Sequence, residues 1–260
     1  MDATAIPLPK TLPDLSGKVA LVTGTTSGLG ARFAWILSNA GAAVALTGRR
    51  IDRLRALHDN ILAAGGKAAA FVLDVTDPNN IREVVHETET ELGAIDILVN
   101  NAGIGIQALA VDLFQNDFDL TLKTNVAGAF FAAQEVGRRM INRKSGGQIV
   151  NITSTGAHNA MPGFVAYCMS KAALVMMTKA LAKEWAPYGI NVNAISPGSV
   201  RTEINSDWLD TESGKAMIDS FPRHRVGEVE DVDEVLLMLC SGKCRIMTGT
   251  EIILDDAQTL

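Results

Sequence analysis

Two residues with complementary acid–base chemistry, Tyr167 and Lys171, lie four positions apart in the segment Tyr-Cys-Met-Ser-Lys. If this segment is helical, both side chains share one face, about one turn apart. A phenol ordinarily ionises near pH 10, and a neighbouring ammonium group favours the phenolate. Tyr167 could therefore act as a general acid and base. The alternative is a surface pair on an amphipathic helix, since this spacing is common by chance.

A glycine-rich turn near the N-terminus could bind a phosphate group. The run Thr23-Gly24-Thr25-Thr26-Ser27-Gly28-Leu29-Gly30 follows an apolar segment and leads into a helical pattern over Ala31–Asn39. Glycine lets backbone N–H groups come close to a ligand, and a helix N-terminus adds a partial positive charge. The pyrophosphate of a dinucleotide suits such a turn. Because the spacing departs from Gly-x-Gly-x-x-Gly, tight packing is the alternative.

The next expected strand ends in Leu46-Thr47-Gly48-Arg49-Arg50, which bears on the kind of dinucleotide. NAD-binding units usually place a carboxylate there to bind the adenosine ribose. Two guanidinium groups instead suit the 2′-phosphate of NADPH. We therefore expect NADPH, with NAD possible. Alternatively, Arg49 and Arg50 only begin the helix through Leu57 as solvated charge.

Asp74 and Val75 follow the third expected strand. The carboxylate of Asp74 could lie near the adenine amino group of a bound dinucleotide. It could equally cap the helix that begins after Asp77-Pro78.

Short apolar runs alternate with longer amphipathic segments throughout the chain, which is typical of βαβ units in a parallel sheet. We expect one doubly wound α/β domain with a seven-stranded, mainly parallel sheet and helices on both faces. Its strands should be buried on both sides. The expected strands are Val19–Val22, Ala43–Thr47, Ala69–Val72, Ile97–Val99, Gln148–Ile152, Asn191–Ile195 and Glu251–Leu254.

The 260 residues favour a single domain over 15–260, preceded by an N-terminal arm over 1–14. The arm contains three prolines and no basic patch followed by an apolar run, so it does not resemble a signal peptide. Residues 201–230 are polar and poorly periodic, and we expect them to form a substrate loop or lid.

The net charge of −6 argues against nucleic acid or an anionic membrane as a partner. No apolar run approaches the roughly 20 residues that a membrane-spanning helix needs. Three cysteines, Cys168, Cys240 and Cys244, favour a reducing cytoplasm. The last two have helical spacing without further ligands nearby, so we expect core packing and no metal site.

The order of motifs from Leu15 to Leu260 resembles the short-chain dehydrogenase/reductase family, in particular its β-ketoacyl reductase-like branch. The resemblance implies a Rossmann fold, a nicotinamide cofactor and hydride transfer to a carbonyl group. Beside the glycine-rich turn and the Tyr-x-x-x-Lys pair, it rests on Asn100-Asn101-Ala102-Gly103, on Asn125, on Ser154 thirteen residues before Tyr167, and on Pro197-Gly198.

The resemblance also implies a role for each catalytic residue. Tyr167 would protonate the carbonyl oxygen, to which Ser154 would hydrogen-bond. Lys171 would bind the nicotinamide ribose and lower the tyrosine pKa, and Asn125 would hold a water that links Lys171 to solvent. Together with the residues above, the resemblance gives these cofactor contacts: Gly24, Thr26, Ser27, Gly28, Leu29, Gly30, Arg49, Arg50, Asp74, Val75, Asn101, Ala102, Gly103, Tyr167, Lys171, Pro197, Gly198, Val200 and Thr202.

Three positions depart from the family pattern. Ser27 stands where many NADPH-preferring members have a basic residue. Asp255-Asp256-Ala257 replaces the frequent Asp-Gly-Gly near the C-terminus, a region that commonly helps to form a tetramer. Thr153 replaces the frequent serine beside the catalytic one.

Two helical segments, 125–140 and 166–185, are apolar on more than one face, which favours a homo-oligomer, either a dimer or a tetramer. A basic cluster, Arg138, Arg139, Arg143 and Lys144, could receive an acidic carrier protein, or it could be a solvated helix end. Plausible walls of a mainly apolar substrate pocket are His158, Asn159, Met161, Phe164, Trp208, Met217 and Phe221, and His158 could serve as an extra acid.

We therefore expect an NADPH-dependent reductase of a small ketone, ketosteroid or β-ketoacyl thioester. One alternative is an NAD-dependent dehydrogenase of a secondary alcohol, polyol or hydroxysteroid. The other, from a different class, is a non-catalytic dinucleotide-binding regulator. The presence of Asn125, Ser154, Tyr167 and Lys171 argues against the regulator.

Overall fold

A computed structural model describes residues 13–260, so the predicted arm over 1–14 lies almost entirely outside the described residues. The chain forms one seven-stranded sheet in the order β3-β2-β1-β4-β5-β6-β7. All six strand pairs are parallel, which confirms the expected doubly wound α/β fold. The strands are β1 (Val19–Val22), β2 (Ala43–Gly48), β3 (Lys67–Val72), β4 (Ile97–Asn100), β5 (Gly147–Ile152), β6 (Ile190–Pro197) and β7 (Glu251–Leu254).

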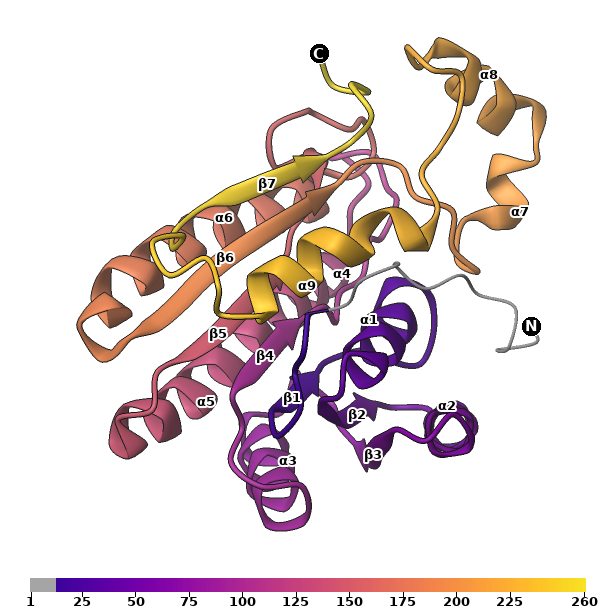
Figure 1. Ribbon diagram of the computed structural model, residues 1–260. Coiled ribbons are helices and arrows are strands. Elements are labelled where there is room, and N and C mark those ends of the chain that lie inside the picture. The colour runs from indigo at the N-terminus through magenta and orange to yellow at the C-terminus, as the bar shows by residue number, and fades with distance from the viewer. Residues whose placement is uncertain (1–12) are drawn as a thin grey trace.

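Helices cover both faces of the sheet, as expected (Figure 1). Alternate strand residues serve the two faces: Ala20 and Val22 join one apolar core, whereas Val19 and Leu21 join the other. This alternation follows from the two-residue period of a strand, and it explains why the central strands are mostly apolar. The expected burial on both sides is wrong for the edge strands, because Lys67 and Val72 of β3 and Ile253 of β7 are exposed. The first core is covered by α1 (Gly28–Asn39), α2 (Ile51–Ala63) and α9 (Asp233–Cys240), the second by α3 (Pro78–Glu91), α5 (Ala129–Arg143) and α6 (Val165–Trp185).

The helix expected over 125–140 is longer than its pattern indicated. It begins as α4 (Gln115–Leu122), passes through a π-helical turn η2 (Lys123–Gly128) and continues as α5. The residues of α4 are mostly polar, so the apolar pattern did not indicate that the helix begins at Gln115. At Gly128 the helix touches the chain after β3, where an added Cβ would lie 2.8 Å from the Val75 carbonyl oxygen.

Two other local expectations need correction. The stretch 201–230 is partly helical, with α7 (Ser206–Leu209) and α8 (Glu212–Ser220) standing together away from the sheet (Figure 1). Asp74 does not cap α3, because the Asp77 side chain accepts the Asn79 N–H there. The remaining short helices are η3 (Thr155–Ala157), η4 (Ala186–Tyr188) and η5 (Val229–Val232).

The two cysteines expected in the core behave differently. Cys240 is buried in α9, as predicted, and burial raises the pKa of its thiol. Cys244 is partly exposed, so its predicted core position is wrong.

A buried ion pair joins α1 to α9 across the first core. The Arg32 and Asp233 side chains are only 2% and 3% exposed. Arg32 Nε lies 3.0 Å and 3.1 Å from the two carboxylate oxygens, and a second guanidinium nitrogen also contacts the carboxylate. Burial raises the pKa of Asp233, and the hydrogen bond from Arg32 opposes that shift. The pair therefore fixes how α9 lies beside α1.

Replacing Asp233 by asparagine should lower the free energy of unfolding by about 3–5 kcal/mol, because the variant removes the buried carboxylate that contacts the Arg32 guanidinium most closely and leaves the more distant Glu230 carboxylate at 3.7 Å. Urea denaturation at neutral pH measures this change. Glu212→Gln is the matched control, since its ion pair with Lys215 is exposed and should contribute less than about 1 kcal/mol. Equal stability of the Asp233→Asn variant and the unmodified protein would contradict the assignment.

Candidate functional site

The candidate residues gather at one edge of the sheet because parallel strands end on the same side. The glycine-rich turn follows β1, Asn101 follows β4, and Ser154 follows β5. The strand order reverses between β1 and β4, where β1 is followed by β2 on one side and borders β4 on the other. Ligands of doubly wound sheets bind in the crevice at such a switch point.

The glycine-rich turn packs against the start of α1 without room for side chains. A Cβ on Gly30 would lie 2.1 Å from the Gly24 carbonyl oxygen and 2.4 Å from Asn101 Nδ2. The Asn101 amide donates to the Thr23 and Gly24 carbonyl oxygens at 2.9 and 3.2 Å. Thr23 Oγ1 accepts the N–H groups of Asn101 and Ala102, both at 3.0 Å. The turn is thus tied to the chain after β4.

The first turn of α1 presents backbone N–H groups that no side chain caps, because Ser27 makes no capping hydrogen bond. An uncapped N-terminus beside a glycine turn fits the pyrophosphate of a dinucleotide. Thr202 lies across this turn, with two side-chain carbons 3.4 Å from a Cβ built on Gly28. Val200 is bridged to Gly227, which anchors the segment between Pro197 and Thr202 over the turn.

Arg50 reaches back from the start of α2 to the glycine-rich turn. Its Nη2 donates to Thr26 Oγ1 at 2.6 Å and to Ser27 Oγ at 3.2 Å. Arg53, which sequence reasoning missed, donates to the Thr26 carbonyl oxygen at 3.4 Å. No sequence motif includes Arg53. It lies beside the loop because it follows Arg50 by about one helical turn. Arg50, which directly precedes α2, and Arg53 of α2 therefore lie beside the cofactor turn, and Arg53 also forms an ion pair with Glu203 at 2.5 Å.

Asp74 lies at the same edge, after β3. Its carboxylate accepts the Thr76 N–H at 2.9 Å. Burial raises the pKa of Asp74, but the hydrogen bonds from Thr76 and the charges of Arg49 and Lys123 outweigh it, so the net shift is downward. A carboxylate that stays ionised is a good acceptor for an amino group.

Tyr167 and Lys171 share one face of α6, as their spacing predicted. Lys171 is 5% exposed, and its Nζ donates to the Ile152 carbonyl oxygen at 2.9 Å. Burial lowers its pKa to about 8. Its Nζ lies 5.5 Å from the centre of the Tyr167 ring.

The direction of the Tyr167 pKa shift corrects an expectation. Burial raises the pKa of this phenol, and the hydrogen bond with Ser154 only partly opposes the shift. The predicted lowering by Lys171 does not prevail, because desolvation penalises the phenolate more strongly. Ser154 itself is oriented by the Gly156 N–H, which donates to its Oγ at 3.0 Å.

Asn125 lies in the π-helical turn η2 and is fully buried. Its Nδ2 donates to the Ile104 carbonyl oxygen at 2.8 Å and to Ser170 Oγ at 2.9 Å, while Oδ1 accepts the Ile104 N–H at 2.8 Å. A Cβ on Gly103 would lie 3.3 Å from Asn125 Oδ1 and 3.5 Å from Lys171 Nζ. Gly103 therefore lies between the asparagine and the lysine. Ser170 was missed, although it directly precedes Lys171.

The predicted pocket walls are only partly brought together. Phe164 packs edge-on against the Tyr167 ring, with centroids 6.4 Å apart, and Met161 lies against Gly156. Trp208 and Met217 belong to α7 and α8, and Trp208 is exposed. His158 does not stand as a free acid, because its ring binds the Glu251 carboxylate.

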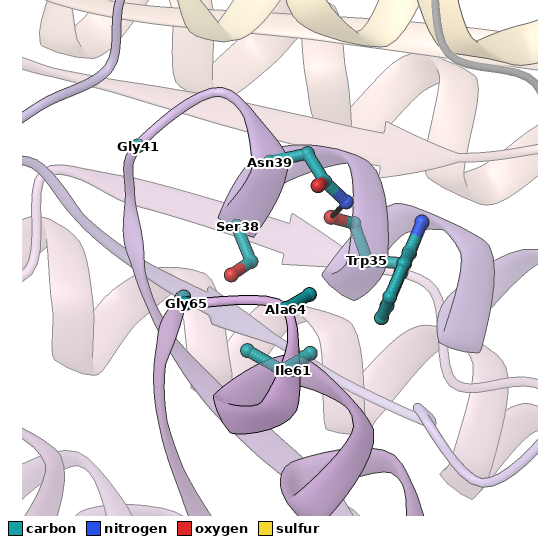
Figure 2. A pocket seen from close by; sticks show the side chains of 8 residues that line it. Trp35, Ser38, Asn39, Gly41, Ile61, Ala64 and Gly65 are labelled. Atoms are coloured by element: carbon teal, nitrogen blue, oxygen red, sulfur yellow. Dashed lines mark hydrogen bonds between the residues drawn. The ribbon is translucent and has the colours of Figure 1, made fainter. Parts of the chain in front are cut away.

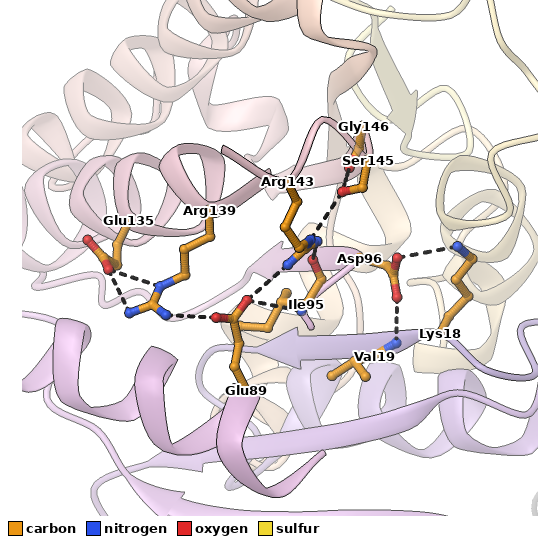
Figure 3. Close-up of polar contacts among 10 residues, drawn as sticks. All are labelled: Lys18, Val19, Glu89, Ile95, Asp96, Glu135, Arg139, Arg143, Ser145 and Gly146. Carbon is orange, nitrogen blue, oxygen red and sulfur yellow. Dashed lines mark hydrogen bonds and ion pairs between the residues drawn. The ribbon is translucent and has the colours of Figure 1, made fainter. Parts of the chain in front are cut away.

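The arginines of the basic cluster at the end of α5 form ion pairs with Glu89 and Glu135, whereas Lys144 is exposed. Arg139 contacts Glu89 at 2.7 Å and Glu135 at 3.0 Å, and Arg143 contacts Glu89 at 2.9 Å (Figure 3). Arg143 also donates to the Ile95 carbonyl oxygen, just before β4. The cluster therefore lies at the opposite edge of the sheet from Tyr167. Arg139 and Arg143 form structural ion pairs there, and the docking of an acidic carrier protein stays a prediction.

A small hollow of about 210 Å³ lies between the ends of α1 and α2. Figure 2 shows Trp35, Ser38 and Asn39 on α1 near Ile61 on α2 and Ala64, which directly follows α2. Both helix ends precede the next strand, so this hollow is at the edge opposite the glycine-rich turn. It does not belong to the candidate site.

Comparison with known proteins identifies the family. A family model described as enoyl-(acyl carrier protein) reductase matches residues 24–256. An NAD-dependent glycerol dehydrogenase of Listeria innocua is 39% identical over 247 residues, covering 95% of this chain and 96% of that protein. A 3-oxoacyl-(acyl-carrier-protein) reductase of Thermotoga maritima is 36% identical over 241 residues, covering 93% and 97%.

Solved structures have the same fold. A short-chain type dehydrogenase/reductase from Mycobacterium marinum superposes with a TM-score of 0.90 at 39% identity, covering 95% of this chain and 98% of that one. A gluconate 5-dehydrogenase from Burkholderia cenocepacia, solved with NADP and tartrate, has a TM-score of 0.90 at 33% identity, covering 95% and 96%. The chain therefore belongs to the short-chain dehydrogenase/reductase family, and it is an NAD(P)-dependent oxidoreductase that acts on alcohol or carbonyl groups.

Proposed function

We propose that this enzyme uses NADPH to reduce a ketone to a secondary alcohol, with Tyr167 as the proton donor. The observation that carries the cofactor assignment is the position of Arg50. Its guanidinium hydrogen-bonds the hydroxyls of Thr26 and Ser27, so a positive charge stands at the turn although residue 27 is not basic. Arg49 adds charge at the end of β2, and Gly48–Arg50 contains no carboxylate to repel a 2′-phosphate.

When bound, NADPH supplies the hydride. The glycine-rich turn and the start of α1 would hold its phosphates, Asn101, Ala102, Gly103, Asp74 and Val75 would border the adenosine, and Pro197 to Thr202 would lie on the nicotinamide side. This assignment rests on the tight approach at Gly30 and on the uncapped N–H groups of α1.

The proton step follows from the pKa directions. Because burial raises its pKa, Tyr167 is protonated at neutral pH and can donate to the carbonyl oxygen. Ser154 hydrogen-bonds the same oxygen, and Lys171 carries a charge below about pH 8. Both Asn125 Nδ2 hydrogens are used by Ile104 and Ser170, so only acceptor atoms of Asn125 can hold the water that links Lys171 to solvent.

The substrate we propose is a small ketone with an apolar group beside the carbonyl. Phe164 and Met161 provide apolar surface next to Tyr167 and Gly156. The paired arginines of α5 give no support to delivery by an acidic carrier protein, since they lie at the far edge and are already neutralised.

A second candidate is an NAD-dependent polyol or secondary-alcohol dehydrogenase. It is favoured by Ser27, which stands where a basic residue would bind the 2′-phosphate, and by the similarity to the glycerol dehydrogenase. In this direction Tyr167 must lose its proton first, so alcohol oxidation would accelerate as the pH rises.

We also propose a cytoplasmic homo-oligomer, a dimer or a tetramer. All three cysteines are free. On α6, Val165, Met169 and Met176 form an exposed apolar stripe, and Met176 is 63% exposed. By length and composition, Val165–Tyr188 could also cross a membrane, but its other face is packed into the core of the sheet. A second copy of the same face would cover this stripe.

The Arg50→Ala substitution should weaken NADPH binding by roughly 10–100-fold, because a charged hydrogen bond to phosphate is lost, and should leave NADH binding nearly unchanged. Titration of each cofactor by nicotinamide fluorescence at fixed salt measures both constants. Arg55→Ala, an exposed arginine of the same helix, is the control. Equal losses for both cofactors would refute the phosphate assignment, and an NADH preference of the unmodified enzyme would favour the second candidate.

Lys171→Met should abolish turnover yet raise the free energy of unfolding by about 1–2 kcal/mol at pH 7. Burial lowers the lysine pKa from 10.5 to about 8, so below pH 8 the folded state bears the full cost of the buried charge. Between pH 8 and 10.5 the unfolded state binds more protons than the folded state, so that cost fades as pH rises.

Urea denaturation at pH 7 and pH 10 tests this sign, with the exposed Lys179→Met on the same helix as the control. The stability gain of Lys171→Met should shrink at pH 10. A variant less stable than the parent at pH 7 would show that the hydrogen bond to Ile152 outweighs the desolvation of the ammonium group.

Met176→Glu should convert the oligomer into smaller species, because it places a carboxylate in the proposed apolar contact. Sedimentation velocity at micromolar concentration measures the change, with the exposed Lys67→Glu on β3 as the control. If the unmodified protein is monomeric, the proposed interface is refuted. If the unmodified protein binds lipid vesicles, the apolar stripe contacts a membrane instead.

A further inference from the structure

A carboxylate that the proposed proton transfer does not use lies behind the catalytic serine. Glu251 begins β7, and its side chain is only 11% exposed. His158 Nε2 lies 2.8 and 2.9 Å from its two carboxylate oxygens. The Ser196 hydroxyl, near the end of β6, also contacts this carboxylate. A mostly buried charge with two specific donors is costly to maintain unless it serves the fold or the site.

The chemistry of the donors and acceptors gives this contact a direction. An ionised carboxylate only accepts, so Ser196 must donate its single hydrogen to Glu251. The oxygen of Ser196 is then left to accept from Thr153, whose hydroxyl lies beside it. Thr153 Oγ1 also donates to the Ile195 carbonyl oxygen at 2.9 Å, so its single hydrogen is shared between that oxygen and Ser196. The charge of Glu251 thus fixes the direction of the Ser196 hydroxyl, whose oxygen faces Thr153.

The chain of hydroxyls joins the segments that position the reacting groups. Thr153 directly precedes Ser154, and Ser196 directly precedes Pro197 and the segment that borders the cofactor. His158 follows η3, the turn that Ser154 begins. Thr153 and Ser196 are buried, where hydrogen bonds between polar groups are stronger than in water. Three strand ends and the serine turn are therefore tied to one carboxylate.

We propose that Glu251 and His158 are positioning residues that hold Ser154 against Tyr167 through Ser196 and Thr153. The inference rests on the proposed role of Tyr167 as proton donor. In Glu251→Gln the amide can donate as well as accept, so Ser196 loses its fixed direction. In His158→Asn the carboxylate loses its outer donor.

The first test reads the ionisation of Tyr167 without any substrate. The chain has two tyrosines, so in a Tyr188→Phe background the phenolate absorbance reports Tyr167 alone. Because the hydrogen bond with Ser154 favours the phenolate, Glu251→Gln and His158→Asn should each raise the pH at which Tyr167 ionises. His58→Asn, another histidine paired with a carboxylate, is the matched control and should cause no shift. An unchanged ionisation in both variants overturns the proposal.

The second test uses single-turnover hydride transfer in the full enzyme. The rate constant should fall roughly tenfold in Glu251→Gln, with cofactor affinity and the urea midpoint nearly unchanged. If this variant does not fold, His158→Asn, whose side chain is 47% exposed, serves in its place. Turnover at the parent rate in the variants overturns the proposal. An inactive parent enzyme would refute the proposed function instead, and the ionisation measurement would still decide the positioning role.

Discussion

The close approach of Gly30 to the Gly24 carbonyl oxygen is the contact on which the rest of the site depends. It leaves no space for a Cβ, and the Asn101 side chain fills the remaining corner with hydrogen bonds to Thr23 and Gly24. β1, α1 and the chain after β4 are therefore held together at the switch point of the sheet. A backbone this close to the helix start can present its N–H groups to a phosphate. Thr202 lies against the same turn, with two side-chain carbons 3.4 Å from a Cβ built on Gly28.

The second requirement of the site is a buried ammonium group. Lys171 is held by the Ile152 carbonyl oxygen and by its place on α6, and burial lowers its pKa. Burial also raises the pKa of Tyr167, so the pKa values of the two groups move apart and the ammonium titrates below the phenol. At neutral pH Tyr167 therefore keeps its proton, and both shifts come from the apolar surroundings that make each group costly to charge.

Arginines of this chain serve three different purposes. Arg32 is buried and holds α9 against α1, whereas Arg139 and Arg143 bind Glu89 at the edge far from the site. Within residues 13–260, the hydrogen bonds of Arg50 go to the hydroxyls of Thr26 and Ser27 at the cofactor turn, and none goes to a carboxylate. The proposed NADPH preference follows from this difference in partners, because a charge already paired in a protein contributes little to an anionic ligand.

Local patterns in the sequence determined the seven strands, the burial of the central strands on both faces, and the placement of Tyr167 and Lys171 on one helical face. These features depend on residue spacing alone, because strand and helix periods are local. The sequence also indicated where the glycine turn and the arginines after β2 would lie. The sequence did not indicate three features: the π-helical turn around Asn125, the helices within 201–230 and the start of α4. Their polar residues show no clear hydrophobic periodicity. Only the tertiary structure decided the partners of Arg139, Glu251 and Arg50. Charge pairing joins residues distant along the chain, and whether a charge is free or neutralised depends on which distant residues the fold brings within hydrogen-bonding distance.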